Sequence, residues 1–104
     1  MNDIRIDLGV YTAFSVDLTN YDFNGIKKVI LTVKNKPDVN LPAIIEREFT
    51  EPKLYRIVVT PEESLLVKMG AVYDFTKVLI DDSRHKEGDN GKVILRAAVG
   101  DCIE

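Results

Sequence analysis

The side chains best suited to chemistry gather in one polar run, residues 81–91, which contains four acidic residues and the only histidine. Carboxylates held close together bind Ca²⁺ through their oxygens. The acidic residues are Asp81, Asp82, Glu87 and Asp89. Arg84 and Lys86 lie among them, however, and the ligand order of an EF-hand loop is absent. We therefore expect a solvated loop here, with neither a metal ion nor another cofactor.

The histidine and the cysteine each lack the partners that would make them reactive. A triad or a zinc site around His85 would need partners for which the sequence carries no signature. Cys102 follows Asp101 rather than a cation, so nothing nearby in the sequence lowers the pKa of its thiol. We expect no catalytic, cofactor-binding or metal-ligating residue, and hence no enzyme.

Composition narrows the classes of partner. The chain has 104 residues, enough for one domain spanning 1–104 with a single core. With 14 Lys plus Arg against 17 Asp plus Glu, the net charge is -3, so no basic field is available to hold nucleic acid. We also expect no membrane partner and no signal peptide, and therefore synthesis in the cytoplasm, where a single cysteine stays reduced.

The first half of the chain reads as strands separated by turns. Residues 4–8 alternate apolar and polar side chains, and residues 10–18 repeat that alternation after Gly9. A third strand is predicted at residues 29–34. The inward side chains of the second strand are Val10, Thr12, Phe14, Val16 and Leu18, whereas Tyr11 points outward. The segment 20–25 is rich in turn-forming residues, with Phe23 turned toward the core.

Two further strands follow, of opposite character. Residues 43–50 carry three consecutive charges, Glu46, Arg47 and Glu48, which is typical of an edge strand protected against unwanted pairing. Residues 54–60 are rich in β-branched and aromatic side chains and predict a strand in the sheet.

One short helix is predicted after Thr60. The hydroxyl of Thr60 suits the N-cap, Pro61 suits the first helical position, and Glu63 completes a capping box. Gly70 is the expected stop, which leaves about two turns. In this reading Leu65, Leu66 and Met69 cover one end of the core.

The last part of the chain predicts a long hairpin. Ala71, Tyr73 and Phe75 share one face, while Val78 and Ile80 have the opposite parity, so a bulge is expected near Lys77. The polar run 81–91 forms the exposed loop, with Asn90 and Gly91 at its tight end. A final strand places four side chains inward: Val93, Leu95, Ala97 and Val99.

These elements predict an all-β fold, an immunoglobulin-like antiparallel β-sandwich of about seven strands with one short connecting helix. Tyr73, just after the connector of a late strand, suits the tyrosine corner of such sandwiches. Gly9 and Gly70 are interpreted as positions that need the backbone freedom of glycine.

Nearly the whole chain resembles the immunoglobulin-like N-terminal domain of phage baseplate upper proteins. In the first half the resemblance rests on residues 4–18, which read as a short strand, a glycine and the strand 11–18, and then on the turn 22–25 and the strand 29–34. In the second half it rests on the Thr-Pro connector at residues 60–64, the strand 70–75 and the closing strand that ends near Gly100. Two features depart from that family: the chain ends at Glu104, where members usually continue, and the hairpin loop is longer and more charged.

The resemblance implies a non-enzymatic phage or prophage virion structural protein, a baseplate or tail component that assembles with copies of itself and with other tail proteins. The hairpin 81–91 and the charged strand 43–50 are then the expected contact surfaces. The alternative is a small binding module for carbohydrate or peptide, which would use exposed aromatic side chains at Tyr11 and Tyr21.

Overall fold

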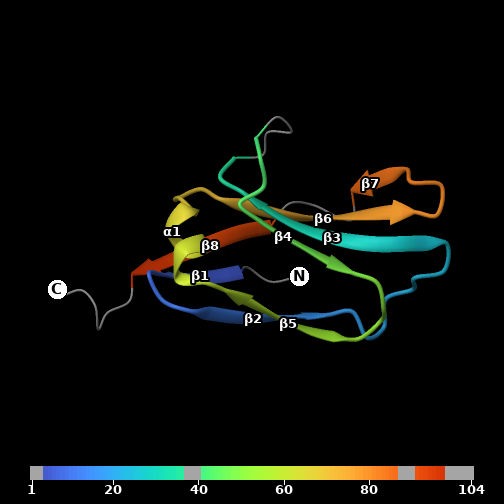
Figure 1. The fold of residues 1–104 in the computed structure, drawn as a ribbon, viewed down its shortest axis with the longest axis horizontal. Helices are drawn as coiled ribbons and strands as arrows, with labels where there is room; N and C mark the ends of the chain where they lie inside the picture. The colour runs from blue at the N-terminus through green and yellow to red at the C-terminus, as the bar shows by residue number, and fades with distance from the viewer. Residues whose placement is uncertain (1–3, 37–40, 87–90, 98–104) are drawn as a thin grey trace.

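Two β-sheets packed face to face make up the fold, with one short helix at an end of the sandwich (Figure 1). The computed structural model describes residues 4–36, 41–86 and 91–97. For residues 96 and 97 only the backbone is described. In chain order the elements are β1 (Ile4–Leu8), β2 (Thr12–Asp17), β3 (Ile26–Lys34), β4 (Ile45–Phe49), β5 (Leu54–Val59), α1 (Pro61–Leu66), β6 (Val72–Leu79), β7 (Arg84–Lys86) and β8 (Gly91–Ala97).

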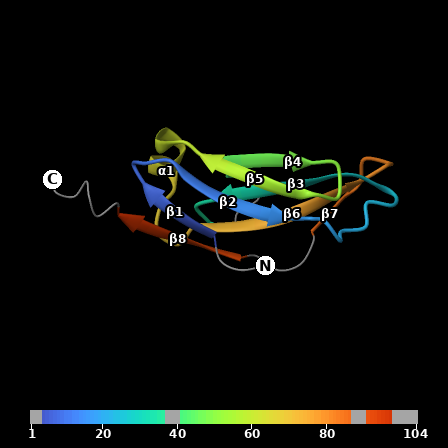
Figure 2. The ribbon, with the colours of Figure 1, turned by 90° about the horizontal axis from the view of Figure 1, so that it is seen from below.

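The two sheets differ in size. The larger sheet has the strand order β1-β8-β6-β3-β4, with β7 also paired to β6, whereas the smaller sheet consists, within the described residues, of β2 and β5. Viewed from below, β2 and β5 form a separate layer against the larger sheet (Figure 2). The prediction of a mostly β sandwich with a single connecting helix is confirmed. The predicted edge position of the charged strand is also confirmed, because β4 ends the larger sheet.

Two details of the sheets differ from expectation. The pair β1 and β8 is parallel, while every other pair among the described residues is antiparallel. The polar run is not only a loop, since β7 pairs with Thr76–Val78 of β6. All three side chains of β7 are exposed. A strand with solvent on both faces needs no apolar alternation, which is why the pattern did not reveal it.

The core lies between the sheets and contains mainly β-branched side chains, as the alternation predicts. Leu31 in β3 and Val59 in β5 are fully buried and come from opposite layers. Phe14 in β2 and Leu18 just after it pack against this core, and Phe23 packs inward as predicted. The remaining buried members of the cluster are Ile4, Ile6, Val16, Val29, Val33, Ile45, Phe49, Ile57, Val67, Ala71, Tyr73 and Val93.

The helix begins as predicted but ends earlier. Thr60 accepts a hydrogen bond from the Glu63 amide, and the Glu63 carboxylate accepts one from the Thr60 amide, which completes the capping box. Helix α1 ends at Leu66, with Val67 as its C-cap, and not near Gly70.

The early end of α1 changes which side chains are buried. Val67 turns into the core and is only 3% exposed. Leu65, Leu66 and Met69 are 65%, 59% and 85% exposed, so the prediction that they cover the core is wrong. Gly9 and Gly70 both have positive φ, 78° and 89°, as their interpretation requires.

The predicted bulge lies in the neighbouring strand. The register between β3 and β6 shifts between Ile26 and Lys28, and not at Lys77. Val78 is therefore buried on the face opposite to Tyr73, outside the main core cluster. Ile80 is 69% exposed because β6 has already ended at Leu79, so its predicted inward position is wrong.

Tyr73 is buried and lies directly against the backbone of Gly91, its partner in the register between β6 and β8. A Cβ atom on residue 91 would overlap the Tyr73 ring. The ring also makes an edge contact with Phe75, at 5.9 Å between centroids. Gly91 is therefore needed for the close approach of the ring. The tyrosine-corner role itself stays a prediction.

Candidate functional site

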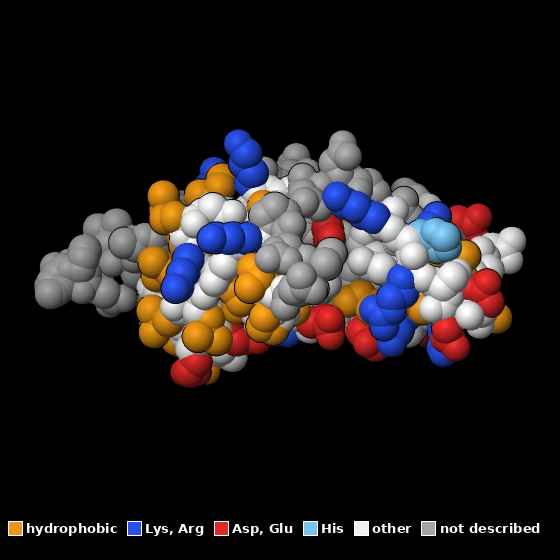
Figure 3. All heavy atoms as spheres, turned by 90° about the horizontal axis from the view of Figure 1, so that it is seen from above, with side chains coloured by type: hydrophobic (Ala, Val, Ile, Leu, Met, Phe, Trp, Pro, Cys, Tyr) orange, Lys and Arg blue, Asp and Glu red, His pale blue; other side chains and the backbone are white. Residues whose placement is uncertain are grey.

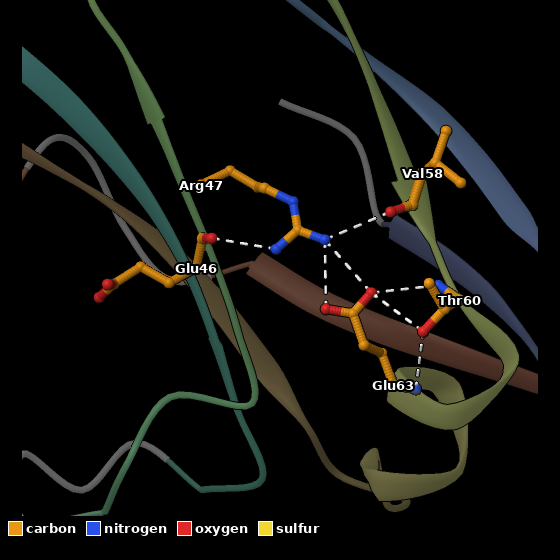
Figure 4. A network of polar contacts seen from close by, with 5 residues as sticks. All are labelled: Glu46, Arg47, Val58, Thr60 and Glu63. Carbon is orange, nitrogen blue, oxygen red and sulfur yellow. Dashed lines mark hydrogen bonds and ion pairs between the residues drawn. The ribbon is translucent and has the colours of Figure 1, made fainter.

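A cluster of polar contacts joins the two sheets on the side where β4 faces β5 (Figure 4). Arg47 lies in β4 opposite Leu31, so its side chain starts on the inner face of the larger sheet. It crosses to the Val58 carbonyl in β5 and to Glu63 in α1. We call the contacts of Arg47 with Val58 and Glu63, together with those of Glu63 with Thr60, the clamp.

Both charged groups of the clamp, the Arg47 guanidinium and the Glu63 carboxylate, have hydrogen-bond partners. Arg47 Nη2 lies 3.2 Å from both carboxylate oxygens of Glu63 and 3.3 Å from the Val58 carbonyl oxygen. Its Nη1 donates to the Glu46 carbonyl at 3.0 Å. Glu63 also accepts a hydrogen bond from the Thr60 amide at 3.1 Å. One guanidinium group therefore ties the edge of β4, the edge of β5 and the start of α1 together.

The charge on Glu63 is stabilised by these contacts. Partial burial by itself raises the pKa of the Glu63 carboxyl group, because it disfavours the charged form. The hydrogen bond from the Thr60 amide and the bond and charge of Arg47 outweigh burial, and the pKa lies below its ordinary value. Arg47 and Glu63 therefore form an ion pair at neutral pH. We interpret this pair as a contact that stabilises the fold.

Side chains also join the sheets on the opposite side, between β1 and β2. The Asp7 amide donates to the Thr12 hydroxyl at 2.9 Å, which connects the two sheets directly. Ser64 is completely buried in α1, where its hydroxyl accepts a hydrogen bond from the Gly9 amide at 2.9 Å and donates one to the Pro61 carbonyl. The helix is thereby fixed to the turn after β1.

The residues singled out in the polar run do not converge on a site. Asp81 accepts two hydrogen bonds from Ser83, and these lower the pKa of its carboxyl group. Asp82 forms an exposed ion pair with Lys27 at 2.8 Å. His85 is exposed and lies 3.2 Å from the Ser83 hydroxyl. These contacts stabilise a tight turn between β6 and β7.

Some of the predicted positions fall beyond the described residues, namely Glu87, Asp89, Asn90, Val99 and Cys102, and for Ala97 only the backbone is described. Across residues 4–36, 41–86 and 91–97, no group of three or more His, Cys, Asp or Glu side chains is arranged to hold a metal ion. In that same part of the chain, no helix has the length and apolar character needed to cross a membrane.

Apolar and aromatic side chains form the other notable surface. Leu65, Leu66 and Met69 project from α1 and the turn after it, and we call them the helix-end patch. Hydrophobic side chains gather at this end of the molecule (Figure 3, left).

Tyr11 is 70% exposed, as predicted. Tyr21 is instead half-buried, because it packs on the core with its ring 5.0 Å from that of Phe23.

Comparison with known proteins leaves the family open. No family model, curated protein or solved structure matches the chain. The resemblance to phage baseplate domains therefore stays a prediction that rests on the residues named for it.

Sequence reasoning identified half of the clamp. The capping-box pattern marked Thr60 and Glu63, because both lie close together in the chain. It did not identify Arg47 as the partner of Glu63, because the two residues are 16 positions apart in the chain. A charged residue on an edge strand also gives the same sequence pattern when its side chain is solvated. Nor did the capping-box pattern identify Ser64, whose hydroxyl accepts a hydrogen bond from the Gly9 amide, 55 positions away in the chain.

Proposed function

We propose that the protein is a non-enzymatic structural module of a phage or prophage particle, a tail or baseplate component that acts by protein–protein assembly. The observation that carries this proposal is the helix-end patch, three large apolar side chains with more than half of their surface exposed at one end of the sandwich. The resemblance to baseplate domains supports the kind of particle.

The helix-end patch is costly to leave in water. Leu65, Leu66 and Met69 are all exposed within five residues of the chain, and apolar side chains gather at this end of the molecule (Figure 3). Burial of such a surface against another protein is the usual source of assembly free energy. The patch thus replaces the hairpin 81–91 and strand 43–50 as the first contact surface to test.

Light scattering on the purified chain, over a range of concentrations, tests the proposal. We expect oligomers for the natural sequence and monomers when Leu65 and Met69 are both changed to Gln. Ile80→Gln is the matched control, because Ile80 is as exposed as Leu65 but lies in the turn near β7, at the other end of the sandwich.

Detection in particles tests the phage context. The protein should be present in tail particles purified after prophage induction of the bacterium that carries its gene. A chain that stays monomeric at high concentration and is absent from such particles would contradict the proposed function.

A binding module for carbohydrate is the second candidate, and Tyr11 favours it because its ring is largely exposed and sugars stack on such rings. Tyr21 no longer supports it as an exposed partner. A glycan array probed with the natural protein and with Tyr11→Ala tests this candidate. Binding that Tyr11→Ala abolishes would support it, and an array without signal would exclude it for the glycans displayed.

A further inference from the structure

We propose that the free edge of β5 binds an extended segment of a partner protein as an added strand, and that this segment carries Asp or Glu between two apolar residues. The inference rests on the proposed function, since it identifies a surface through which an assembly module would hold a neighbour. Strand addition of this kind uses backbone hydrogen bonds for affinity and side chains for selectivity.

The register of the smaller sheet shows which backbone groups are free. The Leu18 amide donates to the Lys53 carbonyl, so that pair is hydrogen-bonded, and hydrogen-bonded pairs then alternate along the antiparallel ladder. The amides and carbonyls of Leu54, Arg56 and Val58 consequently point away from β2. The bond from Arg47 to the Val58 carbonyl confirms this direction. No other strand among the described residues pairs with β5.

The clamp defines where the free edge ends. Because Arg47 occupies the Val58 carbonyl, the accessible part of the edge is centred on Leu54 and Arg56. The added strand is therefore short, about five residues alongside residues 54–58, within the ordinary length of a strand. The edges of β1 and β2 are less suitable near the turn between them, where the Asp7 amide is already bonded to Thr12.

The side chains along β5 indicate the chemistry of the partner. Leu54 and Val58 are 62% and 43% exposed on the outer face, on either side of the exposed Arg56. Within the described residues Arg56 has no ion pair. A neighbouring strand places its side chains beside these three, so apolar residues suit the flanks and a carboxylate suits the centre.

Arg56 also disfavours a second copy of this chain as the partner. The antiparallel register that brings Leu54 next to Val58 of another β5 would place the two Arg56 side chains directly opposite. Like charges at opposite positions destabilise a strand pair. A different protein with an acidic residue at that position avoids this repulsion.

Amide NMR shifts of the ¹⁵N-labelled protein, titrated with designed peptides, test the proposal. The probe is Thr-Val-Thr-Glu-Thr-Val-Thr, and two matched peptides carry Gln or Lys in place of Glu. We expect shifts at the Leu54 and Arg56 amides and the affinity order Glu, Gln, Lys, with roughly a fivefold difference between the extremes. Arg56→Glu should reverse the order, and N-methylation of the central peptide bonds should abolish the shifts.

Four outcomes would overturn the inference: no shift on β5 at millimolar peptide, shifts confined to other elements, affinities independent of the central charge, or binding that survives N-methylation. If the same amides shift as the protein concentration rises without peptide, the strand added to β5 comes from a second copy of this chain and not from a different protein. Failure here is distinguishable from failure of the proposed function, because Arg56→Glu leaves the helix-end patch intact and its assembly can still be measured.

Discussion

The clamp gives the sharpest stability prediction. Arg47→Met removes the guanidinium but keeps an apolar stem, and Glu63→Gln removes the charge but keeps an acceptor for the Thr60 amide. The side chains are 32% and 26% exposed, between a surface pair and a buried one. Exposed pairs contribute about 0.2–1 kcal/mol, so we expect a coupling free energy near the upper end, about 1 kcal/mol at pH 7.

The pH dependence follows from the direction of the Glu63 pKa shift. The pKa is lowered in the folded protein, so the unfolded chain binds a proton first as pH falls. The stabilisation is therefore complete above the ordinary glutamate pKa, about 4.3, and is lost as pH falls through the lower folded value. Stability of Glu63→Gln should lack this component of the acid dependence.

Urea unfolding followed by circular dichroism measures the four free energies of the double-mutant cycle, at pH 7 and again near pH 2. Lys53→Met with Glu51→Gln is the control cycle, because that ion pair is longer, 3.6 Å, and both side chains are more than half exposed. Its coupling should be close to zero. A clamp coupling no larger than the control at pH 7, or one that persists unchanged at low pH, would refute this account of the clamp.

Substitutions at four other positions test the fold in the same assay. Val67→Ala should destabilise the protein by about 1–3 kcal/mol because the side chain is buried, whereas Leu66→Ala should change stability by less than about 0.5 kcal/mol. Gly91→Ala should cost more than about 1 kcal/mol, since the new methyl group overlaps the Tyr73 ring, and a neutral result would contradict that packing. Asp82 has a φ of 69°, so Asp82→Ala should be about 1 kcal/mol less stable than Asp82→Gly, although both lose the same ion pair.

Local patterns predicted local structure well. The strand Ile4–Leu8 has the predicted bounds, and the cap at Thr60 forms both of its expected hydrogen bonds, because each depends on residues near in the chain. The burial of Val67 in place of Leu65 was not predictable from a helix of six residues, which is too short to define an apolar face.

Long-range pairing was beyond the reach of the sequence. The parallel pairing of β1 with β8 joins segments almost a full chain apart, and nothing in either alternation specifies a partner. Arg47 shows the same limit for the clamp: a charged residue on an edge strand has one sequence pattern, whether its side chain is solvated or reaches across to the other sheet.

The small second sheet explains why the molecule has both a clamp and a free edge. Two strands alone are marginally stable in water, so β2 and β5 depend on packing against the larger sheet and on the contacts at Thr12 and Arg47. The contact at Arg47 occupies one backbone acceptor of β5 and leaves the remainder of that edge available.

Arg47→Met should therefore have two effects of opposite sign. It should lower the free energy of unfolding, because the clamp is lost, and it should strengthen binding of the Glu-containing peptide, because the Val58 carbonyl becomes a further acceptor. Peptide titration of Arg47→Met beside the natural protein measures the second effect. Weaker binding by a variant that is still folded would contradict this reasoning. It would mean that Arg47 holds β5 in the conformation that binds the peptide and does not compete with the peptide for the Val58 carbonyl.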